Sequence, residues 1–137
     1  MIKIVYGPKG FGKTKIIKDD VNTAAKNAKG NVVFITDKKT YTVDIDLNVK
    51  CVYAEEYFVS SVSAFTGFVQ GLIAGNSDIE YVFIDALKRI TGENDLSAYE
   101  EFFNSVAKIA KENGTTVELT VSASKEELPK FVLDYIG

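Results

Sequence analysis

The sequence has no histidine and no tryptophan, and Cys51 is its single cysteine. Zinc, haem and iron–sulfur centres need histidine or clustered cysteine ligands, and Ser-His and Cys-His nucleophile pairs need an imidazole base. The composition therefore excludes these classes of site, and any bound metal must be held by oxygen. A lone cysteine in an apolar run cannot form an intrachain disulfide. We expect Cys51 to be a small buried residue in a reducing, cytoplasmic compartment.

Arginine is also scarce in this chain, although lysine is not. Arg89 is its only arginine, and the 137 residues carry a formal net charge of -3. Proteins that bind nucleic acid or anionic membranes gather lysine and arginine on one surface, so this balance argues against a nucleic-acid partner.

Long apolar runs are missing as well. The one long uncharged stretch, residues 57–77, contains glycines, serines, a glutamine and an asparagine, which makes it too polar to span a bilayer. We therefore expect no membrane insertion. Residues 1–7 read as a strand rather than as a basic leader with an apolar core, so no signal peptide is expected either.

The hydrophobic content of 46% is enough to build one buried core, and we expect residues 1–137 to form a single domain. Apolar runs of strand length alternate with segments of helical period. This alternation predicts a three-layer α/β fold, with a mainly parallel sheet and helices on both faces. The predicted strands are 2–6, 31–36, 81–85 and 115–121, and the predicted helices are 13–29, 57–74, 97–113 and 128–136.

Two features of this pattern are less regular. Alternating apolar and polar residues in 41–45 and 49–53 predict a half-exposed hairpin or edge pair that interrupts the alternation of strands and helices. Ser97 with Glu100, and Ser124 with Glu127, have the spacing of a helix capping box.

The segment GPKGFGKT matches the pattern G-x-x-x-x-G-K-[ST], which is typical of a phosphate-binding loop. It leaves a predicted strand and opens a predicted helix, so its main-chain N–H groups and the positive end of the helix would face a polyphosphate. We therefore expect a nucleotide, ATP or GTP, to bind here with Mg²⁺. The predicted binding residues are Gly7, Pro8, Lys9, Gly10, Phe11, Gly12, Lys13 and Thr14.

Two of these side chains have expected roles in that site. The Lys13 ammonium should reach the β and γ phosphates, and the Thr14 hydroxyl should be a ligand of Mg²⁺. Lys9 is a possible extra phosphate contact. The alternatives are a glycine-rich turn of purely structural use, or a degenerate loop that has lost nucleotide binding.

The run Tyr81–Asp85, four apolar residues followed by a carboxylate, resembles the Walker B strand of the P-loop NTPase superfamily. The resemblance implies that Asp85 helps to position Mg²⁺ through its water shell. The whole chain resembles a minimal P-loop core with RecA-like strand order, and is most similar to small uncharacterised bacterial ATP-binding proteins. Its loop is also similar to that of the thymidine-kinase type.

This chain departs from the superfamily pattern at the position of the residue that would activate water. Many members with an extra strand between the two motifs carry a glutamate directly after the aspartate, but this chain has Ala86 there. RecA-like members place that glutamate at the end of the strand preceding Walker B, where this chain has Glu55 and Glu56. These two are the predicted water-positioning bases, and the alternative is an exposed connection with no role.

The resemblance also suggests two further residue roles. The strand end at 120–122 is similar in place to the position that senses the γ-phosphate. Arg89 could act as an arginine finger toward a neighbouring subunit, although a solvated or salt-bridged arginine is the simpler reading.

Three functions are compatible with the sequence. The first is a slow ATPase, a hydrolase that switches contact with a protein partner or with a second copy of itself. The second is a small-molecule kinase, in which residues 57–76 form an acceptor pocket and lid. The third is a nucleotide-binding interaction module without catalysis, which Ala86 favours.

Overall fold

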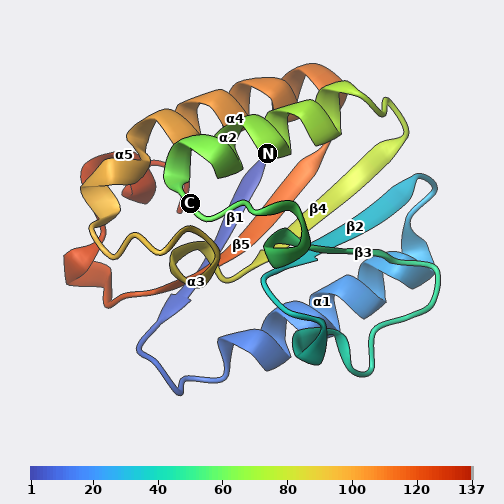
Figure 1. Ribbon diagram of the computed structural model, residues 1–137, viewed down its shortest axis with the longest axis horizontal. Helices are drawn as coiled ribbons and strands as arrows, with labels where there is room; N and C mark the ends of the chain where they lie inside the picture. The colour runs from blue at the N-terminus through green and yellow to red at the C-terminus, as the bar shows by residue number, and fades with distance from the viewer. Residues whose placement is uncertain (137) are drawn as a thin grey trace.

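The computed structural model describes residues 1–136. Five strands alternate with helices along the chain (Figure 1). The strands are β1 Ile2–Gly7, β2 Asn31–Thr36, β3 Lys50–Tyr53, β4 Ile79–Asp85 and β5 Thr116–Ser122. The helices are α1 Lys13–Asn27, α2 Val62–Ala74, α3 Leu87–Thr91, α4 Glu100–Asn113 and α5 Lys130–Leu133. Short 3₁₀ turns lie at Lys39–Thr42, Ala54–Tyr57, Leu96–Tyr99 and Lys125–Glu127.

The five strands form one sheet in the order β1-β5-β4-β2-β3. Every neighbouring pair in it is parallel. The prediction of a mixed α/β fold with a parallel sheet is confirmed at this level. Parallel strands need crossover connections, which explains why apolar runs alternate with helical segments in the sequence.

Helices cover both faces of the sheet, with α1 on one side and α2 and α4 on the other (Figure 1). The α1 face packs Ile17 and Val21 against strand residues such as Phe34 and Phe83. The opposite face holds the larger cluster, in which the stacked rings of Phe65 and Phe102 join α2 to α4 with a centroid separation of 5.6 Å. Because β2 and β4 are apolar on both faces, the chain needs this double cover.

The carboxyl ends of all five strands meet at one edge of the sheet, which is where the candidate site lies. Register pairs Gly7 of β1 with Ser122 of β5, and Thr36 of β2 with Asp85 of β4. Open α/β sheets bind ligands beyond this edge. The phosphate loop, Asp85 and the predicted sensing position are thereby brought together from distant parts of the sequence.

The predicted hairpin or edge pair of residues 41–45 and 49–53 is correct for its second half alone. Residues 50–53 form an edge strand, which pairs with β2 in parallel, whereas residues 41–45 form no strand and Lys39–Thr42 forms a 3₁₀ turn. The loop between them lies over α1, where Asn22 accepts a hydrogen bond from the Asp46 main chain and donates one to the Asp44 carbonyl.

The helix predicted at 57–74 begins later, at Val62. Phe58 has a φ of 58°, a left-handed conformation that ends the preceding turn. Ser61 then caps the helix by accepting a hydrogen bond from the Ala64 main chain at 3.2 Å.

The short helix α3 was not predicted, and one predicted cap is different. Ser97 and Glu100 do not form a capping box; instead, Asp95 accepts from the Ser97 main chain at 3.0 Å. The capping box of Ser124 and Glu127 is present, but on a 3₁₀ turn that precedes the short final helix rather than on that helix itself.

Two remaining expectations concern burial and membrane crossing. Cys51, expected to be buried, is partly buried at the edge of the α1-facing cluster. Across residues 1–136, the structure has no helix with the length and apolar character needed to cross a bilayer.

Candidate functional site

The loop between β1 and α1 has the backbone shape of an anion cradle. Gly10 and Gly12 have φ values of 85° and 92°, which other residues reach only with strain. Gly12 is the N-cap of α1, it provides no side-chain cap, and no acidic residue lies in the first turn. The first N–H groups of the 15-residue helix are therefore left for an external acceptor.

The other loop residues hold this shape. The Phe11 main chain donates to the Pro8 carbonyl at 3.0 Å, which closes the turn. A side chain at Gly7 would come within 2.7 Å of the Phe11 ring, so glycine is required where the strand enters the loop. Phe11 itself is exposed at the tip.

Lys13 lies in the centre of the loop with its ammonium directed inward. It is 7% exposed, and its Nζ donates to the carbonyls of Gly7 at 3.0 Å and Pro8 at 2.9 Å. Burial lowers the pKa of Lys13 from its ordinary value, Asp85 acts to raise it and Lys88 acts to lower it further. A buried ammonium held only by main-chain carbonyls is suited to pairing with an incoming anion.

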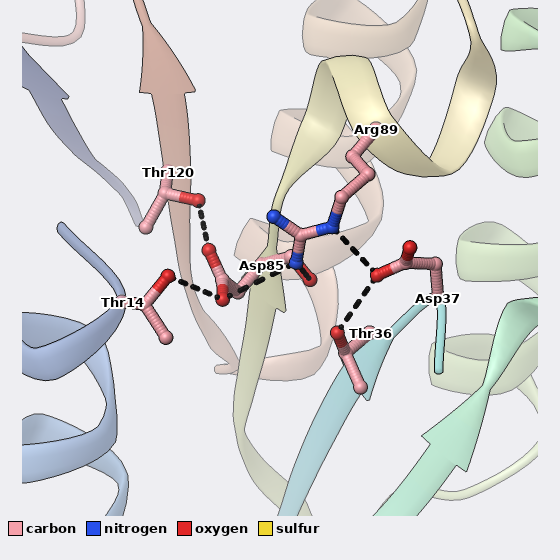
Figure 2. A network of polar contacts seen from close by, with 6 residues as sticks. All are labelled: Thr14, Thr36, Asp37, Asp85, Arg89 and Thr120. Carbon is pink, nitrogen blue, oxygen red and sulfur yellow. Dashed lines mark hydrogen bonds and ion pairs between the residues drawn. The ribbon is translucent and has the colours of Figure 1, made fainter. Parts of the chain in front are cut away.

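Asp85 lies at the end of β4 and is 1% exposed. Its Oδ1 accepts from the Thr120 hydroxyl at 2.6 Å and its Oδ2 from the Thr14 hydroxyl at 3.1 Å (Figure 2). Arg89 Nη2 lies 3.5 Å from the same Oδ2. Three elements, α1, β5 and α3, thus fix this carboxylate in one orientation.

These donors fit Mg²⁺ bound together with a nucleotide. Thr14 and Asp85 provide a hydroxyl and a carboxylate at one point, and Mg²⁺ prefers oxygen ligands and keeps several waters. Within residues 1–136, no three Asp, Glu or Cys side chains converge on one point. A metal here would therefore complete its octahedron with phosphate oxygens and water rather than with further carboxylates.

Arg89 is folded back into its own chain rather than directed toward a neighbouring subunit. Its Nε donates to Asp37 Oδ1 at 2.8 Å and its Nη2 to the Asp85 carbonyl at 3.1 Å (Figure 2). The guanidinium carbon lies 4.0 Å from the centroid of the Tyr41 ring. The salt-bridged alternative for Arg89 describes this structure, and the arginine-finger role is not seen in it.

Asp37 is a residue that the sequence analysis did not single out. It follows β2 directly, and β2 lies next to β4, so Asp37 is close to the end of the strand that carries Asp85. The Thr36 hydroxyl and Arg89 both donate to its Oδ1 (Figure 2). The available signal was a carboxylate immediately after a buried strand, which is the same signal that identified Asp85.

Glu55 and Glu56 lie farther out than the predicted base requires. Both are exposed on the 3₁₀ turn that follows the edge strand β3. Glu55 lines a hollow of about 210 Å³ beside Asp37 and Arg89. Arg89 also lines the hollow over the phosphate loop, so it lies between that loop and Glu55.

The hollow over the loop has a volume of about 310 Å³. A second hollow of about 280 Å³ adjoins it and shares four of its lining residues, Lys9, Ala86, Arg89 and Ser122. The walls of the two hollows carry four cations, Lys9, Lys13, Lys88 and Arg89, and a single carboxylate, that of Asp85. In a chain whose net charge is -3, this concentration of positive charge favours a polyanionic ligand.

A larger and more open hollow, about 680 Å³, lies over α1 and the loop of residues 44–48. Its walls carry Asp44 and Asp46 but only one lysine, Lys26. The balance of charge there is negative, which makes it a poor site for a phosphate.

The predicted sensing position also looks different in the structure. The Thr120 hydroxyl is buried and bound to Asp85. Ser122 instead offers its main-chain carbonyl, which accepts a hydrogen bond from Lys88 Nζ at 2.8 Å. The side chain that reaches the end of β5 is thus Lys88.

Comparison with protein-family models found no match to this sequence, and a search of curated proteins also found none. The functional argument therefore depends on the residues of the site themselves.

Proposed function

We propose that this protein binds a nucleoside triphosphate, ATP or GTP, together with Mg²⁺, and hydrolyses it slowly to switch contact with a protein partner. The observation that carries this proposal is the 3.1 Å contact between the Thr14 hydroxyl and Asp85, two residues 71 positions apart. Each was selected from the sequence as part of a magnesium site, on independent motifs. An α/β fold has no structural need to join these two groups beside a glycine-rich loop.

The residues of the site divide the work of binding. Main-chain N–H groups of residues 10–14 and the Lys13 ammonium would bind the β and γ phosphates, and Thr14 and Asp85 would hold the metal. Mg²⁺ in this place neutralises phosphate charge and orients the phosphates. Lys9 and Arg89 add positive charge at the rim of the same hollow.

The order of the strands supports the proposal. A single strand, β5, separates β1, which leads into the phosphate loop, from β4, which ends at Asp85. The superfamily members that the sequence resembles include those with an extra strand between the two motifs. RecA-like strand order remains part of the proposal.

Calorimetry with purified protein tests binding. We expect MgATP or MgGTP to bind with a measurable enthalpy, and affinity to fall when EDTA removes the metal. Incubation with Mg²⁺ and nucleotide then separates the alternatives: phosphate release indicates hydrolysis, a phosphorylated acceptor indicates a kinase, and intact nucleotide indicates a binding module. Absence of any association would contradict the proposal.

Hydrolysis requires a group that orients the attacking water, and we propose Asp37 for it, which lines the same hollow as Glu55 but is joined to Asp85 through Arg89. This carboxylate is at the end of the strand next to β4 and shares Arg89 with Asp85. We expect Asp37→Asn to lower phosphate release by about a hundredfold, because an amide cannot accept the proton of water although it can still accept from Arg89. Glu55→Gln and Glu56→Gln should leave the rate nearly unchanged.

A single-turnover assay measures the rate of phosphate release in the three variants and compares each rate with that of wild type. Glu55 and Glu56, the bases expected from the sequence, make the natural controls, since both are exposed carboxylates near the same edge of the sheet. A large loss in either glutamate variant with an unaffected Asp37→Asn would reverse the assignment.

The fold does not favour the kinase alternative, in which residues 57–76 would form a lid over an acceptor. Helix α2 lies over the sheet, with Phe65, Val69 and Ile73 fully buried. The inner face of the segment expected to close over an acceptor is thus part of the core.

A further inference from the structure

We propose that Lys88 is the residue that recognises the γ-phosphate, so that the chain itself distinguishes a nucleoside triphosphate from a diphosphate. This inference rests on the proposed nucleotide function and names the group within that site that responds to the terminal phosphate. It was not apparent from the sequence, where Lys88 lies outside both motifs.

The position of Lys88 follows from the turn after β4. The chain leaves β4 at Asp85, and the helix α3 begins at Leu87. Lys88 is thereby carried across the sheet edge to β5, where its Nζ donates to the Ser122 carbonyl at 2.8 Å. Because β5 lies between β1 and β4, this ammonium sits between the strand that enters the phosphate loop and the strand that ends at Asp85.

The hollows join this ammonium to the phosphate loop. Lys88 lines the 280 Å³ hollow, whose wall also includes Lys9 and Ser122, and both of those residues line the hollow over the loop. A phosphate chain that begins on the loop amides and passes Lys13 therefore continues toward Lys88. Ala86, which lines both hollows, has only a methyl side chain and leaves the way between them open.

The present partner of Lys88 is one that an anion can replace. Arg89 is already engaged by two carboxylates and by the Tyr41 ring. Lys88, in contrast, has no ion pair within residues 1–136, and its hydrogen bond goes to a neutral carbonyl. Glu127, whose pKa the charge of Lys88 helps to lower, accepts a hydrogen bond from the Ser124 main chain at 2.9 Å.

Repulsion between lysines points in the same direction. Lys13 lines the hollow over the loop, and Lys88 lines the hollow that adjoins it. Two ammonium groups facing adjoining hollows repel each other, and an anion between them relieves that repulsion. A phosphate contacted by both relieves that repulsion, and the terminal phosphate is the one that extends past Lys13 toward β5.

The test measures two affinities on each variant by calorimetry with Mg²⁺ present. The probes are ADP and a non-hydrolysable ATP analogue with an imido bridge between its β and γ phosphates. We expect Lys88→Met to weaken binding of the triphosphate analogue by about tenfold and to change ADP affinity little, because a single charge-assisted contact is lost. Lys88→Arg should retain the preference for the triphosphate, because it keeps the charge.

The control is Lys111→Met, which removes an equivalent charge from the exposed end of α4 and should change neither affinity. Thermal unfolding of each variant establishes that the fold is retained. Equal losses for both nucleotides, or no loss for either, would overturn the role of Lys88 while leaving nucleotide binding in place. Wild-type protein that binds neither nucleotide would overturn the proposed function, and this inference with it.

Discussion

Replacing Lys13 with alanine is expected to weaken MgATP binding by at least about a hundredfold, as measured by calorimetry. The ammonium is the one buried cation of the loop, and it already points into the cradle toward the Gly7 and Pro8 carbonyls. Binding exchanges these neutral partners for phosphate oxygens, so the variant loses a charge-assisted contact in a partly desolvated setting. The glycines that shape the loop are unchanged.

The matched control is Lys15→Ala, two residues farther along the same helix. Its side chain is 81% exposed and pairs with Asp19 at the surface, so it contributes the same charge without facing the loop. Surface ion pairs of this kind contribute little. We expect Lys15→Ala to bind within about twofold of wild type, and equal losses in the two variants would mean that the loop attracts anions only through general charge.

Much of the fold could be predicted because local patterns and long-range packing agree. Strand β2 is apolar on both faces and α1 has one apolar stripe, and each was found at nearly its observed bounds. The failure at residues 41–45 has a specific cause. The main chain at residues 44 and 46 is held by Asn22 rather than by a neighbouring strand, and a side chain 22 and 24 positions away leaves no mark on the local sequence.

The residues of the candidate site also fall into two groups, those that a local motif identifies and those whose position depends on long-range packing. The loop and Asp85 were visible because a motif fixes their chemistry within a few residues. Asp37, Lys88 and the inward fold of Arg89 depend instead on which strands lie side by side. Without the knowledge that β2 neighbours β4, nothing distinguishes Asp37 from Glu55 and Glu56, at the end of β3, as the group that orients water.

The second large effect concerns stability and lies on the face of the sheet that α1 covers. Glu118 is on β5, which packs between β1 and β4, and it is 7% exposed. Burial raises the pKa of Glu118 to about 8, assisted by a hydrogen bond with Asp20 and by the charge of Asp20, while Lys3 acts to lower it. Its Oε2 is a buried atom without a hydrogen-bond partner in the described part of the chain.

The free energy of unfolding should therefore fall as pH rises from about 4.5 to about 8. In that window the folded chain keeps a proton on Glu118 that the unfolded chain has released. Each rise of one pH unit therefore lowers the free energy of unfolding by at most about 1.4 kcal/mol. Below the window both states are protonated, and above it both are ionised, so the dependence flattens at either end. Function at neutral pH thus coexists with a carboxyl group whose ionisation opposes folding.

Glu118→Gln should remove this dependence, because its amide stays neutral throughout. Urea unfolding at pH 5, 6.5 and 8 should show the variant near wild type at pH 5 and at least about 2 kcal/mol more stable at pH 8. Glu112→Gln on the exposed end of α4 serves as the control and should follow the wild-type profile. Parallel profiles for wild type and Glu118→Gln would mean that this carboxyl ionises normally in the folded chain, with water or Lys3 compensating its charge.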